Sequence, residues 1–382
     1  MPWQECSTMT LRQEFLALAQ QPGANFSRLC RRFGISRKTG YKWQRRYREK
    51  GVADLADRSR RPQHSPRRSD PAIEEQVLLI RDQYGWGARK IKSCLERAGQ
   101  GPLAKSTVHA ILSRHERLTN LATKTVGAYQ RFEQERPNQL WQMDFKGHFR
   151  LGNQERCHPL TVLDDHSRYA LCLQACRNQQ TATVQQQLTA TFRRYGLPER
   201  MLMDNGSPWG NDLAHQYTPL TVWLLQLGIA VSHSRPYHPQ TQGKDERFHR
   251  SLKVEVLAQR VFADFTRMQS RFDEWRSCYN HVRPHEALAM EVPASRYQSS
   301  PRSFPERLPP LEYAATDQVR KVQTDGKISF RHREFRIGKA FRGYPVALRP
   351  TTTDGVYEVY FATHRISQID LHQPTNRPSA DD

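Results

Sequence analysis

The sequence predicts a multidomain chain with an all-α front, an α/β centre and a small all-β module near its end. Three changes of pattern lead to this division. Apolar residues recur at helical spacing before residue 119, they alternate with period two from Leu140, and short strand patterns with turn signals follow residue 317. The length of 382 residues fits about two to four domains.

Composition narrows the class of protein. No apolar run approaches the length of a membrane span, and the start lacks a basic-then-apolar leader pattern. The seven cysteines are scattered without a Cys-x-x-Cys pair, so we expect neither disulfides nor a structural zinc site, and a cytoplasmic location. The formal net charge of +21 predicts a polyanionic partner, most commonly nucleic acid.

The front of the chain, residues 1–58, predicts a helix-turn-helix domain. Helical patterns cover residues 11–20, 25–33 and 37–50, with Ser36 placed to cap the third. In that third helix Gly40, Trp43 and Tyr47 share the core side, and a basic face lies opposite, as in a helix that enters the major groove. The candidate DNA contacts on it are Arg37, Lys38, Tyr41, Lys42, Arg45 and Arg48. The alternative is a solvated basic three-helix bundle.

A basic linker at 59–70, which contains Arg60 and Arg61, is expected to follow phosphates or the minor groove. Residues 71–120 predict a second, nearly neutral helix-turn-helix-like domain, which could instead serve packing or subunit contacts. Its expected helices are 73–83, 88–97 and 108–117, the last capped by Ser106 or Thr107. A polar linker at 121–138 follows.

Residues 139–291 show the element order of an RNase H-like fold, a five-stranded mixed sheet with flanking helices. The order is three strands, helix, strand, helix, strand and two helices, and the first three strands are expected to form an antiparallel meander. The expected strands are 141–151, 157–164, 168–175, 199–204 and 229–232, and the expected helices are 181–195, 212–227 (loosened near Pro219), one carrying Glu246, and 265–280.

The last part of the chain predicts a Pro-rich linker at 292–317, a small β-barrel at 318–372 and a polar tail at 373–382. The expected strands are 319–323, 328–332, 346–349 and 356–361, with turn signals at 324–327 and 353–355.

Three carboxylates are placed to meet at one edge of the central sheet. Asp144 lies midway along an apolar strand, Asp204 ends another, and Glu246 lies in the first turn of a helix. Taken singly, Asp204 with its following Asn-Gly also fits a turn, and Glu246 fits a helix-dipole acid. Together they suit Mg²⁺, which takes hard oxygen ligands and leaves positions for phosphate oxygens. Two such ions could assist an in-line displacement without a covalent protein nucleophile.

Four blocks of residues carry a family resemblance. They are Trp141-Gln142-Met143-Asp144-Phe145, Leu163-Asp164-Asp165-His166-Ser167-Arg168, Asp204-Asn205-Gly206-Ser207, and the run from Arg235-Pro236-Tyr237-His238 to Gly243-Lys244-Asp245-Glu246-Arg247. The chain resembles the DDE transposases of the insertion-sequence/retroviral integrase superfamily, and is most similar to bacterial insertion-sequence enzymes with an integrase-type core. The resemblance covers about residues 10–300.

The resemblance implies that Asp144, Asp204 and Glu246 are the catalytic and metal-binding triad, with Mg²⁺ or Mn²⁺, two ions, as cofactor. It implies cleavage of DNA strands at the inverted-repeat ends of an insertion sequence and transfer of the 3′-OH ends to target DNA. The interval between the second and third acids is longer than is usual in the family, and the extra length falls at 209–219. Asp245 is the rival third acid, since neighbouring helical positions differ by about 100°; the family pattern selects Glu246.

Further site residues are weaker predictions. His238, Gln240 and Lys244 precede or begin the helix of Glu246 and are candidate DNA contacts, as is Lys253, for which simple solvation is equally good. One of Asp164 and Asp165 is expected to pair with Arg168 in a structural role.

The resemblance implies double-stranded DNA as partner, a homodimer or homotetramer on DNA, and a location in the bacterial cytoplasm at the nucleoid. Two other readings remain: a catalytically silent DNA-binding regulator derived from a transposase, and an RNase H-like nuclease acting on RNA or junctions. The acidic triad argues against the first, and the basic front argues against the second.

Overall fold

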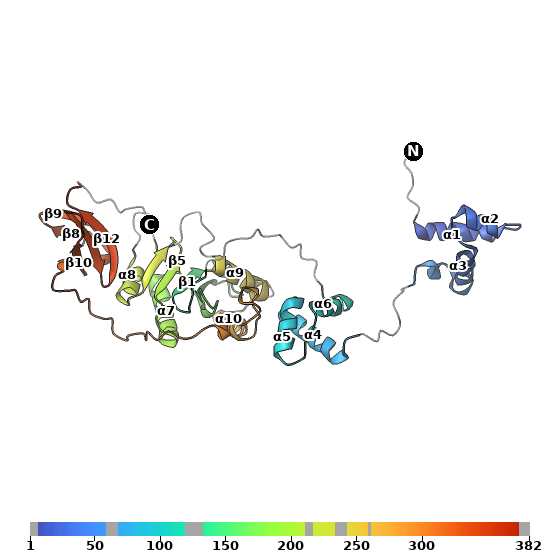
Figure 1. Cartoon of the computed structure of the whole chain (residues 1–382), viewed down its shortest axis with the longest axis horizontal. Coiled ribbons are helices and arrows are strands. Elements are labelled where there is room, and N and C mark those ends of the chain that lie inside the picture. Colours follow the sequence, from blue (N-terminus) through green and yellow to red (C-terminus); the bar gives the residue numbers. More distant parts are fainter. Residues whose placement is uncertain are drawn as a thin grey trace. The chain divides into compact units, whose positions relative to one another are not determined.

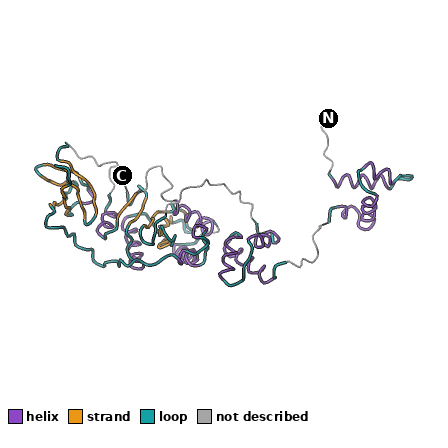
Figure 2. Tube along the Cα trace, viewed as in Figure 1, coloured by secondary structure: helices purple, strands orange, loops and turns teal. Residues whose placement is uncertain are grey.

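The structure is a computed structural model that describes residues 7–58, 68–118, 133–210, 217–233, 243–258 and 261–373. The chain divides into two compact units, residues 1–68 and 69–382. Figure 1 labels the elements, and Figure 2 shows that the structure changes from helices to a strand-containing fold after α6.

The first unit is a small helical domain. It contains α1 (Thr8–Ala19), α2 (Phe26–Arg32), α3 (Arg37–Lys50) and the short 3-10 helix η1 (Gly51–Leu55). Ser36 caps α3 as predicted, since its hydroxyl accepts a hydrogen bond from Thr39 N. A Cβ at Gly40 would lie 2.9 Å from Cys30 Sγ, so glycine lets α3 approach α2 closely.

Three helices begin the second unit: α4 (Pro71–Tyr84), α5 (Ala88–Arg97) and α6 (Lys105–Arg114). Their apolar faces meet around Trp86, Ile91 and Val108. The expected start of the last helix at residue 108 was wrong. The helix begins at Lys105 after Ala104, so Ser106 and Thr107 lie inside its first turn and do not cap it.

These helices also contact α10 (Phe265–His281) and the segment that follows it. Arg97 donates to the Val282 carbonyl at 3.2 Å, and Ser93 Oγ donates to the Met290 carbonyl at 3.4 Å. Cys278 packs against the same apolar cluster. The packing role that the sequence left open is therefore present, through α5.

The central sheet has the order expected of an RNase H-like fold. Its strands are β1 (Leu140–Phe145), β2 (Phe149–Arg150), β3 (Arg156–Asp164), β4 (Ala170–Cys176), β5 (Arg200–Met203) and β6 (Ala230–His233). Strand β3 pairs antiparallel with β1, β2 and β4, and β5 lies parallel between β1 and β6. The sheet has six strands rather than five, because the expected strand 141–151 is interrupted at 146–148, where Gly147 adopts φ +76.

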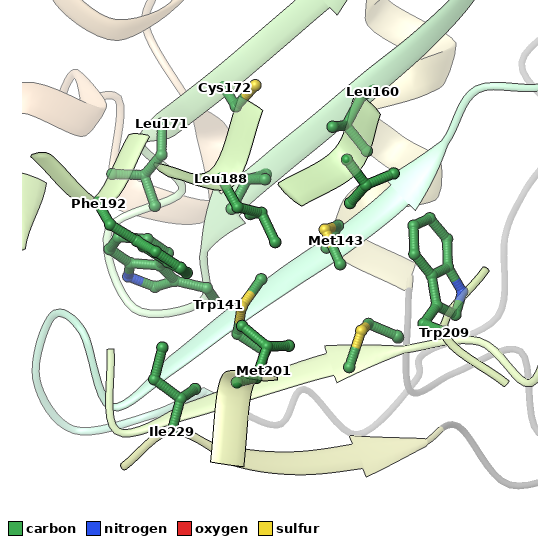
Figure 3. Close-up of a cluster of buried hydrophobic side chains, with 14 of the residues drawn as sticks. Trp141, Met143, Leu160, Leu171, Cys172, Leu188, Phe192, Met201, Trp209 and Ile229 are labelled. Carbon is green, nitrogen blue, oxygen red and sulfur yellow. The ribbon is translucent and has the colours of Figure 1, made fainter. Parts of the chain in front are cut away.

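Helices cover both faces of this sheet. On one face, α7 (Thr181–Tyr195) and α8 (Pro219–Gln226) enclose a core that includes Trp141, Met143, Met201 and Phe192 (Figure 3). On the other face, α9 (Gly243–Leu252), its π-helical continuation Lys253–Leu257 and α10 (Phe265–His281) pack on Leu163 and Leu173. Alternate residues of β1 thus serve opposite faces.

The expected helix 212–227 is shorter than predicted. Helix α8 begins at Pro219, where Thr218 and Thr221 form a reciprocal capping box. Residues 211–216 lie outside the described part of the chain, and residues 217–218 are not helical.

The segment 292–317, expected to be a linker, packs against the central domain. Arg302 donates to the carbonyls of Pro198, Leu227 and Gly228, and Leu197 N donates to the Arg302 carbonyl at 2.7 Å. The segment contains the short 3-10 helix Pro293–Ser295, and its prolines disfavour longer helices or strands. Hydrogen bonds to the domain beside it hold it in place.

The final domain consists of two antiparallel sheets. Strands β12 (His364–Asp370), β11 (Val356–Phe361), β10 (Pro345–Pro350) and β7 (Gln318–Lys321) form one, and β8 (Lys327–Phe330) with β9 (Arg333–Arg336) form a hairpin. Both expected turns are present. The expected barrel is not confirmed: between the described strands, no ladder of hydrogen bonds closes the two sheets into one.

Within the parts of the chain described here, no helix is both long and apolar enough to cross a membrane.

Candidate active site and nucleic-acid interface

Asp144 lies near the end of β1, where it pairs in register with Thr161 of β3. Its side chain is 25% exposed, and Phe145 N donates to Asp144 Oδ1 at 2.7 Å. Burial, and after it the negative charges of Asp204 and Glu246, raise the pKa of Asp144 to about 7. The charges of Asp204, which follows β5, and of Glu246, on α9, therefore act on Asp144.

Asp204 follows β5, which runs parallel beside β1. The pairing of Gln142 with Leu202, continued by two residues, brings Asp144 opposite Asp204 at the same edge of the sheet. Asp204 Oδ1 accepts hydrogen bonds from Gly206 N at 2.9 Å and from the Trp209 indole. The loop is tight, since a Cβ at Gly210 would lie 2.6 Å from the Asn205 carbonyl oxygen.

The first turn of α9 carries two acids in different surroundings. Glu246 is exposed, and its charge contributes to the raised pKa of Asp144. Asp245 is 0% exposed, and neither of its carboxylate oxygens has a hydrogen-bond partner among the described residues. Burial, and then the charge of Asp144, raise the pKa of Asp245 well above its usual range. The rival acid therefore faces the interior beside Asp144, and Glu246 lies on the outer side.

His249 is a site residue that the sequence prediction missed. Its Nδ1 lies 3.9 Å from Asp144 Oδ2, and its Nε2 lies 2.9 Å from Thr161 Oγ1. Burial, and then the charge of Lys146, lower the pKa of His249 to about 3, so the ring is neutral. The available signal was its position three residues after Glu246, which puts both on neighbouring parts of one helix surface.

The acids fit a cation more readily than a protein partner. Among the described residues, neither Asp144 nor Asp204 forms an ion pair with a lysine or arginine, and Asp245 brings two further unpaired oxygens. A divalent ion would offset the negative charge that, after burial, raises the pKa of Asp144 and of Asp245. As they stand, however, no three His, Cys, Asp or Glu side chains in the described ranges are arranged to hold a metal ion.

The basic face predicted on α3 is present. Trp43 and Gly40 are buried against the core of the first unit, while the predicted contacts border one shallow, open hollow along the helix. These residues are Arg37, Lys38, Tyr41, Lys42, Arg45 and Arg48. Tyr41 is exposed and stacks on Phe26 with ring centroids 4.4 Å apart, so the hollow combines cations with an exposed aromatic ring.

The other predicted DNA contacts have different outcomes. Arg60, Arg61, His238 and Gln240 lie outside the described residues. Lys253 is exposed, in the π-helical turn after α9.

Lys244 does not point to solvent. Its side chain is 17% exposed, and its Nζ lies 2.5 Å from Asp165 Oδ1. Lys244, a candidate DNA contact in the sequence, therefore forms a buried ion pair, because the first turn of α9 packs against the turn after β3.

The sequence predicted that Asp164 or Asp165 pairs with Arg168, and this prediction was wrong. Arg168 donates to Glu133 Oε2 at 2.9 Å. Asp164 instead accepts hydrogen bonds from Asn138 N and Ser167 N, both at 2.7 Å. The carboxylates of Asp164 and Asp165 thus have a structural role, but with other partners than Arg168.

Models of known protein families match parts of this chain, from the first helical unit to the final domain. Models described as an integrase core domain match residues 134–239 and 227–293, and a model of the IS481 family transposase C-terminal domain matches residues 317–377. A helix-turn-helix domain model matches residues 11–63, and a homeodomain-like domain model matches residues 39–112.

Individual proteins are similar over parts of the chain. The uncharacterized 39.2 kDa protein of insertion element IS476 from Xanthomonas euvesicatoria is 27% identical over 51% of this chain and 49% of its own length. The uncharacterized 31.7 kDa protein of insertion element IS407 from Burkholderia multivorans is 24% identical over 57% of this chain and 77% of its own. The chain thus spans about half the length of the first of these relatives.

Among solved structures, a chain of the simian T-cell lymphotropic virus intasome in complex with the PP2A regulatory subunit B56 gamma is similar. It is 15% identical, with a TM-score of 0.38, and the match covers 78% of this chain and 99% of that one.

Proposed function

Because this chain belongs to the insertion-sequence transposases of the integrase superfamily, we propose that it acts on the DNA ends of its own element. It binds the terminal inverted repeats, cleaves DNA strands there and joins the 3′-OH ends to target DNA. The observation that carries this proposal is the placement of Asp144 and Asp204 by two parallel strands at the same edge of the sheet, where the charges of Asp204 and Glu246 help to raise the pKa of Asp144.

The three acids are proposed to hold Mg²⁺ or Mn²⁺, two ions, during the reaction. When bound, such ions stabilise the charge that develops on the attacking and leaving oxygens of a phosphoryl transfer. Asp144 would be a ligand only in its ionised form, and its raised pKa means that binding a cation must first displace a proton near neutral pH. In the loop after β5, Gly206 N and the Trp209 indole donate to Asp204 Oδ1 and so orient its carboxylate.

Neutral His249 lies beside Asp144 and hydrogen-bonds its neighbour Thr161. The Thr161 hydroxyl donates to the Asp144 carbonyl at 3.0 Å, so its oxygen is left to accept from His249 Nε2. His249 Nδ1 then presents a lone pair toward Asp144 and adds no positive charge that would compete with a metal ion.

DNA recognition is proposed to rest on α3. Its cationic, aromatic-containing outer face has the character of a helix that lies in a major groove and contacts phosphates on either side. We also propose that a homodimer or homotetramer forms on DNA, since two ends must be joined, and that the protein works at the nucleoid in the bacterial cytoplasm. A silent DNA-binding regulator would not need the repelling acids, and we do not favour it.

The catalytic proposal is tested with the full chain and linear DNA that carries the inverted repeats flanking this coding region. Wild-type protein is expected to nick the ends and transfer them to a second DNA only when Mg²⁺ or Mn²⁺ is present. Asp144→Asn is expected to lose both activities and to keep end binding. The matched control is Asp82→Asn. It removes a half-exposed carboxylate that pairs with Arg117 and lies on α4, outside the central sheet domain. Strand transfer by Asp144→Asn at the wild-type rate would exclude the assignment.

The recognition proposal is tested by measuring how the affinity for the DNA ends depends on salt concentration. Replacing both Lys42 and Arg45 with alanine removes two cations from the α3 face, so the slope of log binding constant against log salt is expected to fall by about two. Replacing Arg331 and Arg336, exposed on the C-terminal hairpin, provides a charge-matched control. Equal loss in both pairs would mean that charge alone, rather than α3, holds the ends.

A further inference from the structure

One carboxylate, Asp165, joins the two elements that carry Asp144 and Glu246. It lies in the turn after β3 and is 1% exposed. Asp165 Oδ1 accepts a hydrogen bond from Gln142 Nε2 at 2.8 Å and lies 2.5 Å from Lys244 Nζ. Gln142 is two residues before Asp144 on β1, and Lys244 is two residues before Glu246 on α9. A single oxygen atom therefore links the strand to the helix.

The rest of Asp165 is held as firmly. Its backbone N–H donates to the Leu140 carbonyl at 2.9 Å, which attaches the turn to β1. Its second oxygen accepts from Gln134 N at 2.9 Å, and Lys244 Nζ also reaches the Asp165 carbonyl at 3.2 Å. Both oxygens of the Asp165 carboxylate and the Lys244 ammonium thus have partners, the condition under which a buried ion pair is tolerated.

Glu246 has no comparable support of its own. Over the described ranges it forms no hydrogen bond or ion pair, so its place depends on the helix that carries it. The later turns of α9 are anchored by the buried side chains Phe248 and Leu252. At its first turn, Lys244 provides a polar connection to the domain through the carboxylate and the carbonyl of Asp165.

We propose that Asp165 and Lys244 are positioning residues, which set the separation between Asp144 and Glu246 through Gln142 and the first turn of α9. This inference rests on the proposed function for the identity of the acids. It adds the contacts that keep Asp144 and Glu246 at a fixed separation. An ion pair that served only stability would have no reason to contact both elements at the second residue before each acid.

The test compares Lys244→Met, Lys244→Arg and Asp165→Asn in the full chain. The readouts are Mn²⁺ affinity by calorimetry, the Mg²⁺ dependence of end cleavage, and end binding. Lys244→Met and Asp165→Asn are expected to weaken Mn²⁺ binding or the maximal rate by about 10- to 100-fold, with end binding unchanged. Lys244→Arg keeps the cation and is expected to retain most of both. The double variant should lose little more than the worse single variant, because the two residues act as one unit.

The control is Glu133→Gln, which weakens a nearby ion pair with Arg168. Among the described residues this pair has no hydrogen bond to β1 or α9. Circular dichroism at each temperature identifies unfolded protein, and Asp165→Asn, nearly isosteric, serves if Lys244→Met does not fold. Unchanged Mn²⁺ affinity and rate in folded Lys244→Met, or losses matched by Glu133→Gln, would overturn the positioning role. Wild-type protein that binds Mn²⁺ but cleaves no DNA would overturn the proposed function instead, while the calorimetric comparison would still decide the role of the pair.

Discussion

Two groups of acids lie at the central sheet, and their surroundings are opposite. Asp164 and Asp165 follow β3 and are surrounded by donors: backbone N–H groups, Ser167, Gln142 and Lys244. Asp144 and Asp245 face other acids, and Asp245 has no hydrogen-bond partner in the described structure. Burial is common to both groups. What separates a structural carboxylate from a candidate cation site is therefore the number of protein donors that satisfy it.

The sharpest test of this comparison is to delete one acid from each group. Asp165→Ala leaves Lys244 as a buried cation without its partner, so it is expected to lower the free energy of unfolding by about 3–5 kcal/mol. Asp144→Ala removes a carboxylate that repels its neighbours and is expected to change it far less. Urea denaturation of both variants without metal checks this. Equal losses would erase the distinction between the two groups.

The pH dependence of stability provides a second test. The pKa of Asp144 is about 7 in the folded chain and near 3.8 when unfolded, so the folded state holds a proton that the unfolded state has lost between these values. Stability without metal is therefore expected to fall as pH rises from about 4 to about 7, by up to about 4 kcal/mol from this residue. Asp144→Asn cannot ionise and should reduce the slope of that part of the profile, with the contribution of Asp245 remaining, which thermal unfolding across this pH range would show.

A divalent ion should act on one group and not on the other. If Mg²⁺ binds only the folded chain, a concentration of 100 times its dissociation constant is expected to stabilise it by about 2.7 kcal/mol. Asp204→Asn should lose this gain, because an amide is a poorer ligand and carries no charge. Glu155→Gln, a surface acid paired with Arg177, should keep it. Thermal shifts with and without Mg²⁺ provide the measurement, and a shift retained by Asp204→Asn would place the ion elsewhere.

Long periodic segments were predictable in detail. The bounds of α3, α5 and α7 agree with the sequence prediction, because each has a continuous apolar face and a clear start or stop. Shorter or irregular segments were not. The break after β1 depends on Gly147, and the late start of α8 depends on a capping box at Thr218 and Thr221. The local sequence pattern does not show where such a strand breaks or such a helix begins, because tertiary packing decides it.

The candidate site divides in the same way. Asp144 and Asp204 could be placed at one sheet edge from strand pattern alone, and Glu246 at the start of a helix. The ion pair of Lys244 with Asp165 was not foreseen, because a lysine in a polar loop-to-helix junction looks solvated until its partner is known. His249 was missed because its role depends on Thr161, which is 88 positions away in the chain.

The sequence by itself determined the order of the domains, the basic face of α3 and the three acids at the edge of the sheet, because charge and hydrophobic period are local properties. Only the tertiary structure decided which acids are satisfied. It buried Asp245 without a partner, gave Asp165 its donors, and used Lys244 to connect β1 with α9. The physical reason is that the state of a carboxylate depends on the donors and charges that folding brings to it, and these come from distant parts of the chain.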